Sequence, residues 1–162
     1  MTQHFLGTKL TEAYEALSEK QSGKYPPGSP GYNVVYPDGY QSWSPKEVFE
    51  KAYYPVGANY PLKLNKKVVE NYISSIDYWK CSDHSMIGLV TLRNGFTFSV
   101  FNGCVNGSEF SEEYAKKDIQ EKALAETWRL LGFILRWASE GNSFGEGDQS
   151  YAVILDINEV AG

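Results

Sequence analysis

The hydrophobic pattern is clearest over residues 79–137, where two short apolar runs precede a long stretch of helical periodicity. The runs at 86–92 and 96–101 are rich in β-branched and aromatic residues, and Arg93-Asn94-Gly95 separates them. Asn-Gly supplies the two positive-φ residues that a two-residue type I′ loop requires. The pattern therefore predicts a β-hairpin with Asn94-Gly95 as its loop.

This loop sets the register of the hairpin, and Ser85 then falls opposite Cys104. One face is predicted to carry Ile87, Leu89, Thr91, Phe96, Phe98 and Val100, and the other Met86, Val90, Leu92 and Phe101. A half-exposed hairpin would alternate apolar and polar residues, whereas both of these faces are largely apolar. We expect one face to pack on the long helix. The other face is left to the N-terminal region, a second copy of the chain or a ligand, with the N-terminal region favoured.

A long amphipathic helix is predicted to follow the hairpin and to stop near Gly141. Ser108 or Ser111 can cap it, and residues 109–115 can form a separate first turn. Acidic side chains at its start favour the positive end of the helix dipole; they are Glu109, Glu112 and Glu113. The apolar stripe predicted to be core consists of residues 119, 123, 124, 130, 131, 134 and 135.

The first 60 residues are predicted to form a small module of strands and one short helix. A strand at 5–13 and a Gly- and Pro-rich loop at 18–31 precede a compact hairpin that turns at Pro37-Asp38-Gly39. Ser44 is then expected to cap a helix with Pro45 at its first position, ending near Tyr54-Pro55.

Two further elements complete the predicted chain. Asn65 is expected to cap a helix running through residue 79, with an apolar face made of Val68, Val69, Tyr72, Ile73 and Ile76. After a flexible loop at 141–150, the β-prone run 151–157 is expected to return as a strand on this sheet or on that of a partner subunit.

The predicted fold class is therefore α+β: an antiparallel sheet built around the hairpin, a long helix on one face, and the small N-terminal module. The predicted division is 1–60 for the N-terminal module, 61–140 for the core domain, and 141–162 for the loop and last strand.

Charge and composition exclude several classes of protein. The net charge of −5 argues against general nucleic-acid binding, because a phosphate-binding surface shows an excess of Lys and Arg. No run of 18 apolar residues and no signal segment is present, so we expect neither membrane insertion nor secretion. Two cysteines, Cys81 and Cys104, are interpreted as free thiols in a reducing compartment.

One segment resembles a known family. A T-L-x-N-G-F hairpin centred on Asn94-Gly95, the stretch from Gly103 to Val105, and a helix pattern formed by Ala123, Trp128, Leu130, Gly132 and Leu135 carry the resemblance. Residues 79–137 thereby resemble the bacteriophage family named for gene product 49 of an N-four-type podophage and gene 66 of a Shigella phage. The chain departs from that pattern at Leu131, where Glu is expected before Gly132.

The N-terminal segment resembles a second phage module. Residues 1–55 contain its G-Y-x-S-W-S-P-K-E-x-F-E core, beginning at Gly39 and ending at Glu50. The module carries no described chemistry. Together the two resemblances imply a phage or prophage accessory protein that acts in the cytoplasm of a host bacterium.

Candidate catalytic and metal sites are weak in this sequence. Cys81-Ser82-Asp83-His84 has the spacing of half a zinc site, but only Cys104 and His4 could complete it. The same residues do not favour a Cys-His nucleophile pair, because side chains three apart on an extended segment point to opposite faces. The carboxylates of the long helix, Asp118 among them, are read as dipole partners in solvent, and Gly141, Gly145 and Gly147 make no phosphate loop. We expect no metal, no cofactor and no enzymatic activity.

A basic stripe on the long helix is the more suggestive pattern. Lys122, Arg129 and Arg136 are seven residues apart, so they drift by only about 20° per step and line one helix face. Guanidinium groups there could hold phosphates while Phe101 or Trp137 stacks a base. The favoured alternative is a solvated face on which Glu126 pairs with Lys122 and Arg129.

Two functions follow from these patterns. The first is an oligomeric, non-enzymatic binder that sequesters a small anionic signal of the cyclic nucleotide type, a counter-defence role similar in scale and context to the anti-Thoeris sponge proteins. In it, the second apolar hairpin face would assemble the subunits. The second is a protein inhibitor of a host defence or nucleic-acid-binding enzyme, suggested by the pI near 5.1 and the abundant aromatic residues.

Overall fold

The computed structural model describes residues 8–57 and 63–141, which form two antiparallel three-stranded sheets and three helices. The N-terminal part contains β1 (Glu12–Leu17), β2 (Pro30–Val35), β3 (Gln41–Pro45) and α1 (Lys46–Ala52). The C-terminal part contains α2 (Lys66–Tyr72), β4 (Ile73–Ser82), β5 (Ser85–Leu92), β6 (Thr97–Gly103), the 3-10 turn η1 (Gly107–Glu109) and α3 (Glu112–Glu140). The predicted α+β class is confirmed.

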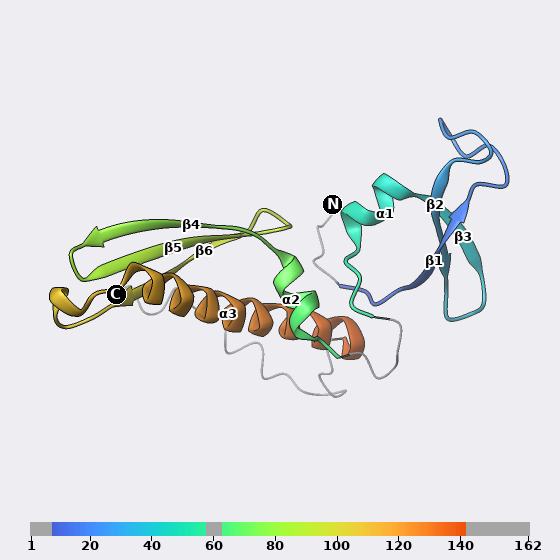
Figure 1. The fold of residues 1–162 in the computed structure, drawn as a ribbon. Coiled ribbons are helices and arrows are strands. Elements are labelled where there is room, and N and C mark those ends of the chain that lie inside the picture. The colour runs from blue at the N-terminus through green and yellow to red at the C-terminus, as the bar shows by residue number, and fades with distance from the viewer. Residues whose placement is uncertain (1–7, 58–62, 142–162) are drawn as a thin grey trace, which may run out of the picture.

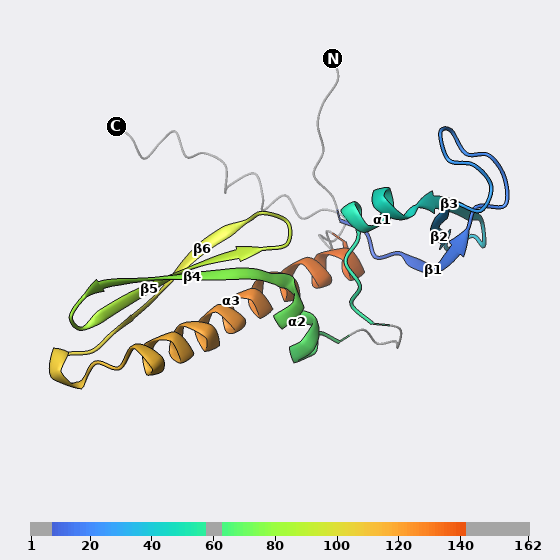
Figure 2. The same ribbon diagram turned by 45° about the horizontal axis from the view of Figure 1, so that its top comes forward.

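The long helix α3 lies along one face of the β4-β5-β6 sheet (Figures 1 and 2). Its buried residues recur every four positions; they are Ala115, Ile119, Ala123, Thr127 and Leu131. The strand β5 supplies the other half of this core with Met86, Val90 and Leu92. Gly88 lies between them, and a Cβ added there would be 2.5 Å from Cγ2 of Ile119. The helix therefore approaches the sheet closely because Gly88 has no side chain.

The hairpin of β5 and β6 exists, but its register differs by one residue from the prediction. The loop contains three residues, Arg93-Asn94-Gly95, and Gly95 alone among them has a positive φ, of 84°. Ser85 therefore pairs with Gly103, not with Cys104. Because side chains alternate along a strand, this shift moves Phe98 and Val100 to the face of α3 and Phe101 to the opposite face.

The helix predicted after Asn65 is half right. The Asn65 side chain accepts a hydrogen bond of 3.0 Å from the backbone N–H of Val68, which confirms the cap. The helix ends at Tyr72, however, and Ile73–Ser82 is the strand β4, paired antiparallel to β5. Ile76 and Tyr78 pack on the α3 side of the sheet, as alternate residues of a strand do.

Both ends of α3 follow the sequence closely. Ser111 is the N-cap and accepts from the N–H of Tyr114 at 3.3 Å, while Ser108 belongs to η1. Gly141 is the C-cap, with a φ of 64°. The predicted core stripe needs one correction, because Ile134 is 41% exposed and does not belong to the core.

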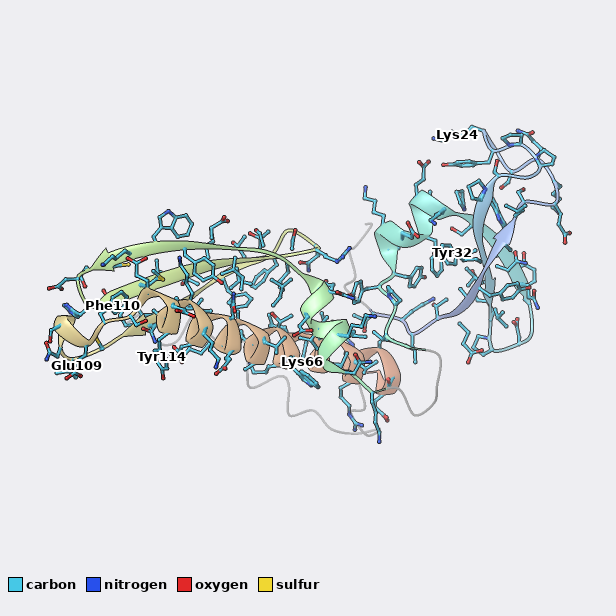
Figure 3. The ribbon with its side chains drawn as sticks, viewed as in Figure 1. Lys24, Tyr32, Lys66, Glu109, Phe110 and Tyr114 are labelled. Atoms are coloured by element: carbon cyan, nitrogen blue, oxygen red, sulfur yellow. The ribbon has the colours of Figure 1, made fainter. Side chains whose placement is uncertain are left out.

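The N-terminal sheet has α1 on one of its faces. Tyr32 of β2, labelled in Figure 3, lies in this part of the chain. Its ring stacks on that of Phe49 of α1, with ring centroids 4.4 Å apart. On the other face the Trp43 ring lies against Gly31 and donates from Nε1 to the carbonyl of Ala16 at 3.2 Å.

Two predictions for this module were wrong. The first strand occupies Glu12–Leu17 instead of 5–13, because these are the residues that pair with β2. Ser44 does not cap α1: it pairs with Tyr32 in the sheet, and Pro45 occupies the cap position without a side-chain hydrogen bond.

Tyr54 connects the two parts of the described chain. Its hydroxyl donates to the carbonyl of Val68 at 3.0 Å, and its ring packs edge-on against Tyr72 at 4.8 Å. The division of the chain into residues 1–60, 61–140 and 141–162 stays a prediction. The strand expected at 151–157 lies outside the described residues.

Candidate functional site

The predicted basic stripe is present on α3, and each of its cations has a carboxylate partner. Lys122 pairs with Asp118 and also donates from Nζ to the carbonyl of Phe101 at 3.1 Å. Arg129 donates to Glu126 through two N–H groups, one at 2.9 Å. Nη1 of Arg136 lies 3.2 Å from a carboxylate oxygen of Glu140. The alternative of a solvated, internally paired face thus describes Arg129 and Glu126, whereas Lys122 takes a different carboxylate.

These pairs change the ionisation of the acids. Hydrogen bonds from Lys122 and then from Asn102, the latter 2.7 Å long, lower the pKa of Asp118 below its usual value. The hydrogen bond from Arg129 lowers the pKa of Glu126, and the same bond raises the pKa of Arg129. Asp118, Glu126 and Arg129 therefore stay charged at neutral pH. The three carboxylate partners offset the three cations of the stripe.

The Asp118 pair predicts a pH dependence of stability. Because the folded pKa is lowered, the contribution is present above the unfolded pKa of about 3.9 and is lost as the pH falls towards the folded value. Asp118→Asn should cost about 1 kcal/mol or less near pH 7, because the side chain is 24% exposed. In thermal unfolding from neutral to acid pH, the difference in Tm from the parent should narrow as the pH falls.

The matched control for this pH series is Glu113→Gln, which removes a carboxylate from the first turn of α3. A Tm difference for Asp118→Asn that stays constant down to the acid limit would contradict the ion-pair account.

The two predicted stacking rings lie in different places. Trp137 is half-buried near the C-terminal end of α3, with its ring 6.0 Å from that of Phe133, which is 67% exposed. Phe101 is on the sheet face opposite α3, where its ring covers Gly103. The structure therefore brings Trp137 near the stripe and separates Phe101 from it.

Phe133 is the residue that the sequence reasoning missed. It is four residues after Arg129, three before Arg136 and four before Trp137, so helical spacing places it between them. We call Arg129, Phe133, Arg136 and Trp137 the Arg-aromatic cluster. The two guanidinium groups are 70% and 74% exposed and keep N–H donors that the carboxylates do not use.

The second candidate surface is the sheet face opposite α3, which we call the outer face. It consists of Ser75, Asp77 and Trp79 from β4, Ile87, Leu89 and Thr91 from β5, and Thr97, Ser99 and Phe101 from β6. Trp79 and Phe101 are 50% and 59% exposed, so the described N-terminal residues do not cover this face as expected. Among the residues that the structure describes, no helix lies on this side of the sheet (Figures 1 and 2).

The candidate residues for metal or nucleophile chemistry lie at the end of β4, in the turn between β4 and β5, and just after β6. The Asp83 carboxylate accepts a hydrogen bond of 2.6 Å from Nδ1 of His84, and this bond lowers the pKa of Asp83. The Cys104 thiol is directed to the carbonyl of Asn106 at 3.1 Å. Within 8–57 and 63–141 no three His, Cys, Asp or Glu side chains gather as a metal site would need.

A shallow hollow at the N-terminal half of α3 is lined by Tyr114, Lys117, Asp118 and Glu121. Figure 3 shows Tyr114 on this helix, close to Glu109 and Phe110 of the preceding turn. The volume of this hollow is about 90 Å³. Ligand pockets are usually several times larger, at about 300 Å³ or more, so this hollow alone does not enclose a nucleotide.

The helix–sheet unit that carries both surfaces is similar to a family of bacteriophage proteins. Residues 64–138, from just before α2 almost to the end of α3, match the model of the phage protein (N4 Gp49/phage Sf6 gene 66) family. The family resemblance found in the sequence is thereby confirmed. No curated protein and no solved structure matches the chain.

In the described ranges, the helices are all too short or too polar to cross a lipid bilayer.

Proposed function

We propose that this phage accessory protein acts by binding and not by catalysis, and that it sequesters a small anionic ligand of the cyclic nucleotide type as an oligomer. The observation that carries this proposal is the Arg-aromatic cluster. Two exposed guanidinium groups flank two aromatic rings on one helix surface. Guanidinium forks bind phosphate and aromatic rings stack on bases, which are the two parts of a nucleotide.

The carboxylate partners of the cluster shape how such a ligand would bind. Glu126 and Glu140 offset the charge of Arg129 and Arg136, so a phosphate gains little from the net field. It would instead use the free N–H donors, with the pairs holding the guanidinium groups in place. The open helix surface has no enclosing wall, so the ligand would be held from one side only, and an oligomer would carry one such surface on each subunit.

Removing both arginines should abolish ligand capture. The protein purified from bacteria is examined by native mass spectrometry, and the parent is expected to carry a stoichiometric anion of a few hundred daltons. Arg129→Gln/Arg136→Gln should lose this mass. The same proteins titrated with a cyclic dinucleotide probe should show at least tenfold weaker binding for the double variant.

The matched control is Lys117→Gln, an exposed cation elsewhere on α3, and it should retain the ligand. A parent protein that carries no anion and takes up no cyclic dinucleotide would overturn this function.

The second candidate is inhibition of a host defence or nucleic-acid-binding enzyme by protein contact. The N-terminal sheet favours it, because tyrosines common at protein interfaces are exposed there; they are Tyr14, Tyr36 and Tyr40, at 51%, 43% and 64%. Residues 142–162 contain no Lys or Arg and carry four of the five net negative charges of the chain, on Glu146, Asp148, Asp156 and Glu159. A specific bacterial protein retained by the parent and lost from Tyr14→Ala/Tyr40→Ala would favour this function over sequestration.

A further inference from the structure

The outer face is arranged in three cross-strand rows that differ in polarity. Strand pairing places Trp79, Ile87 and Phe101 side by side in the first row. The second row is Asp77, Leu89 and Ser99, and the third is Ser75, Thr91 and Thr97. An aromatic or aliphatic row is thus followed by a mixed row and by a row of hydroxyl groups. Asp77 is the single charged residue among these nine.

We propose that the outer face binds a second copy of this chain, face to face, about a two-fold axis that runs along β5. The proposal rests on the oligomer in the proposed function and names its interface. An axis along β5 exchanges the two edges of the sheet but keeps each row at the same height. Each row therefore meets the same row of the partner, with β4 over β6.

This symmetry makes the face self-complementary. Trp79 packs on the partner's Phe101, and Ile87 and Leu89 pack on the same residues of the partner, which buries apolar groups on apolar groups. Asp77 faces the partner's Ser99, whose hydroxyl can donate to the carboxylate. The hydroxyl rows meet each other, and threonine and serine side chains can both donate and accept there.

The other in-plane axis, perpendicular to the strands through the middle row, gives a poorer match. It places the Trp79 row over the partner's hydroxyl row, and it stacks Asp77 directly on the partner's Asp77. Like charges that face each other in a partly desolvated interface oppose association. The charge and the row order therefore favour the axis along β5.

The size of the face sets the expected strength. Three strands about 4.8 Å apart and five residues long at about 3.3 Å per residue cover roughly 240 Å² per copy. Stable interfaces bury about 800 Å² per partner. We therefore expect a weak dimer whose population rises with concentration, not a permanent one.

Sedimentation velocity across a concentration series tests the interface. The parent should shift from monomer to dimer as concentration rises, and Trp79→Ser/Phe101→Ser should weaken dimerisation at least tenfold. The matched control is Phe96→Ser, because Phe96 is 53% exposed on the same hairpin but lies at its tip opposite Leu92. A parent that stays monomeric, or a control that weakens the dimer as much as the double variant, would overturn the proposal.

Cysteine cross-linking tests the axis in the full chain with Cys81→Ser and Cys104→Ser in place. Copies with Asp77→Cys and copies with Ser99→Cys are mixed and treated with a short bis-maleimide. The axis along β5 predicts cross-links in the mixture and none in Asp77→Cys alone. Efficient cross-linking of Asp77→Cys to itself would overturn this axis.

The two proposals fail separately. Arg129→Gln/Arg136→Gln should lose the bound anion and keep the dimer, whereas Trp79→Ser/Phe101→Ser should lose the dimer. A dimer without any bound anion would leave the interface standing and refute the ligand.

Discussion

Gly88→Val is expected to destabilise the C-terminal core by about 3 kcal/mol, the largest effect of any single change proposed for it. The added Cβ would lie 2.5 Å from Cγ2 of Ile119 and 3.2 Å from Cγ2 of Ile76. Ile119 is fully buried and β-branched on a helix, so its side chain has little freedom to turn away. Relief requires α3 to move off the sheet. Urea denaturation followed by circular dichroism measures the loss.

Gly132→Ala is the matched control, because a Cβ at Gly132 meets no atom within 4 Å. Alanine is the better helix former by about 1 kcal/mol, so this substitution should raise the midpoint of unfolding. If Gly88→Val unfolded at the same urea concentration as the parent, the close approach of α3 to β5 would be contradicted.

Gly31→Ala is expected to unfold the N-terminal sheet while the C-terminal part stays folded. A Cβ at Gly31 would lie 2.3 Å from the carbonyl oxygen of Ser44 and 2.5 Å from the Trp43 ring. A backbone oxygen cannot rotate away as a side chain can, so β2 and β3 must separate. We expect a loss of about 3 kcal/mol or more for this part of the chain.

Hydrogen exchange of backbone amides in the full chain measures this effect in each part. Amides of β1, β2 and β3 should lose protection, and those at Ile119 and Ala123 in α3 should keep it. Ser42→Ala is the control in β3, where it removes only a hydrogen bond of 3.4 Å to Tyr36. Equal loss of protection in α3 would show that the two parts unfold together, and would contradict the predicted division near residue 60.

The two strongest local signals in the sequence predicted their elements well. The hairpin centred on Asn94-Gly95 and the helix ending at Gly141 are both present. Each depends on interactions within a few residues, namely a turn with glycine at positive φ and a C-cap glycine whose N–H donates to the carbonyl of Trp137. Ser111 and Asn65 cap helices for the same local reason.

The candidate site was predicted less completely. Helical spacing correctly placed Lys122, Arg129 and Arg136 on α3, but it did not decide which carboxylate each would take. Lys122 reaches Asp118 and the backbone of β6 because the sheet lies beside that helix face. Phe133 was overlooked although its spacing from Arg129 and Trp137 was visible in the sequence.

The sequence by itself determined the element types at the strong turn and cap signals, the α+β class and the family of the matched segment. Tertiary structure alone decided where α2 ends and which hairpin face carries Phe101. Residues 76–79 fit either helical or alternating spacing, and pairing with β5 selected the strand. A turn of three residues instead of two moved Phe101 to the outer face. Both outcomes depend on partners distant in the chain, and short-range propensities do not contain them.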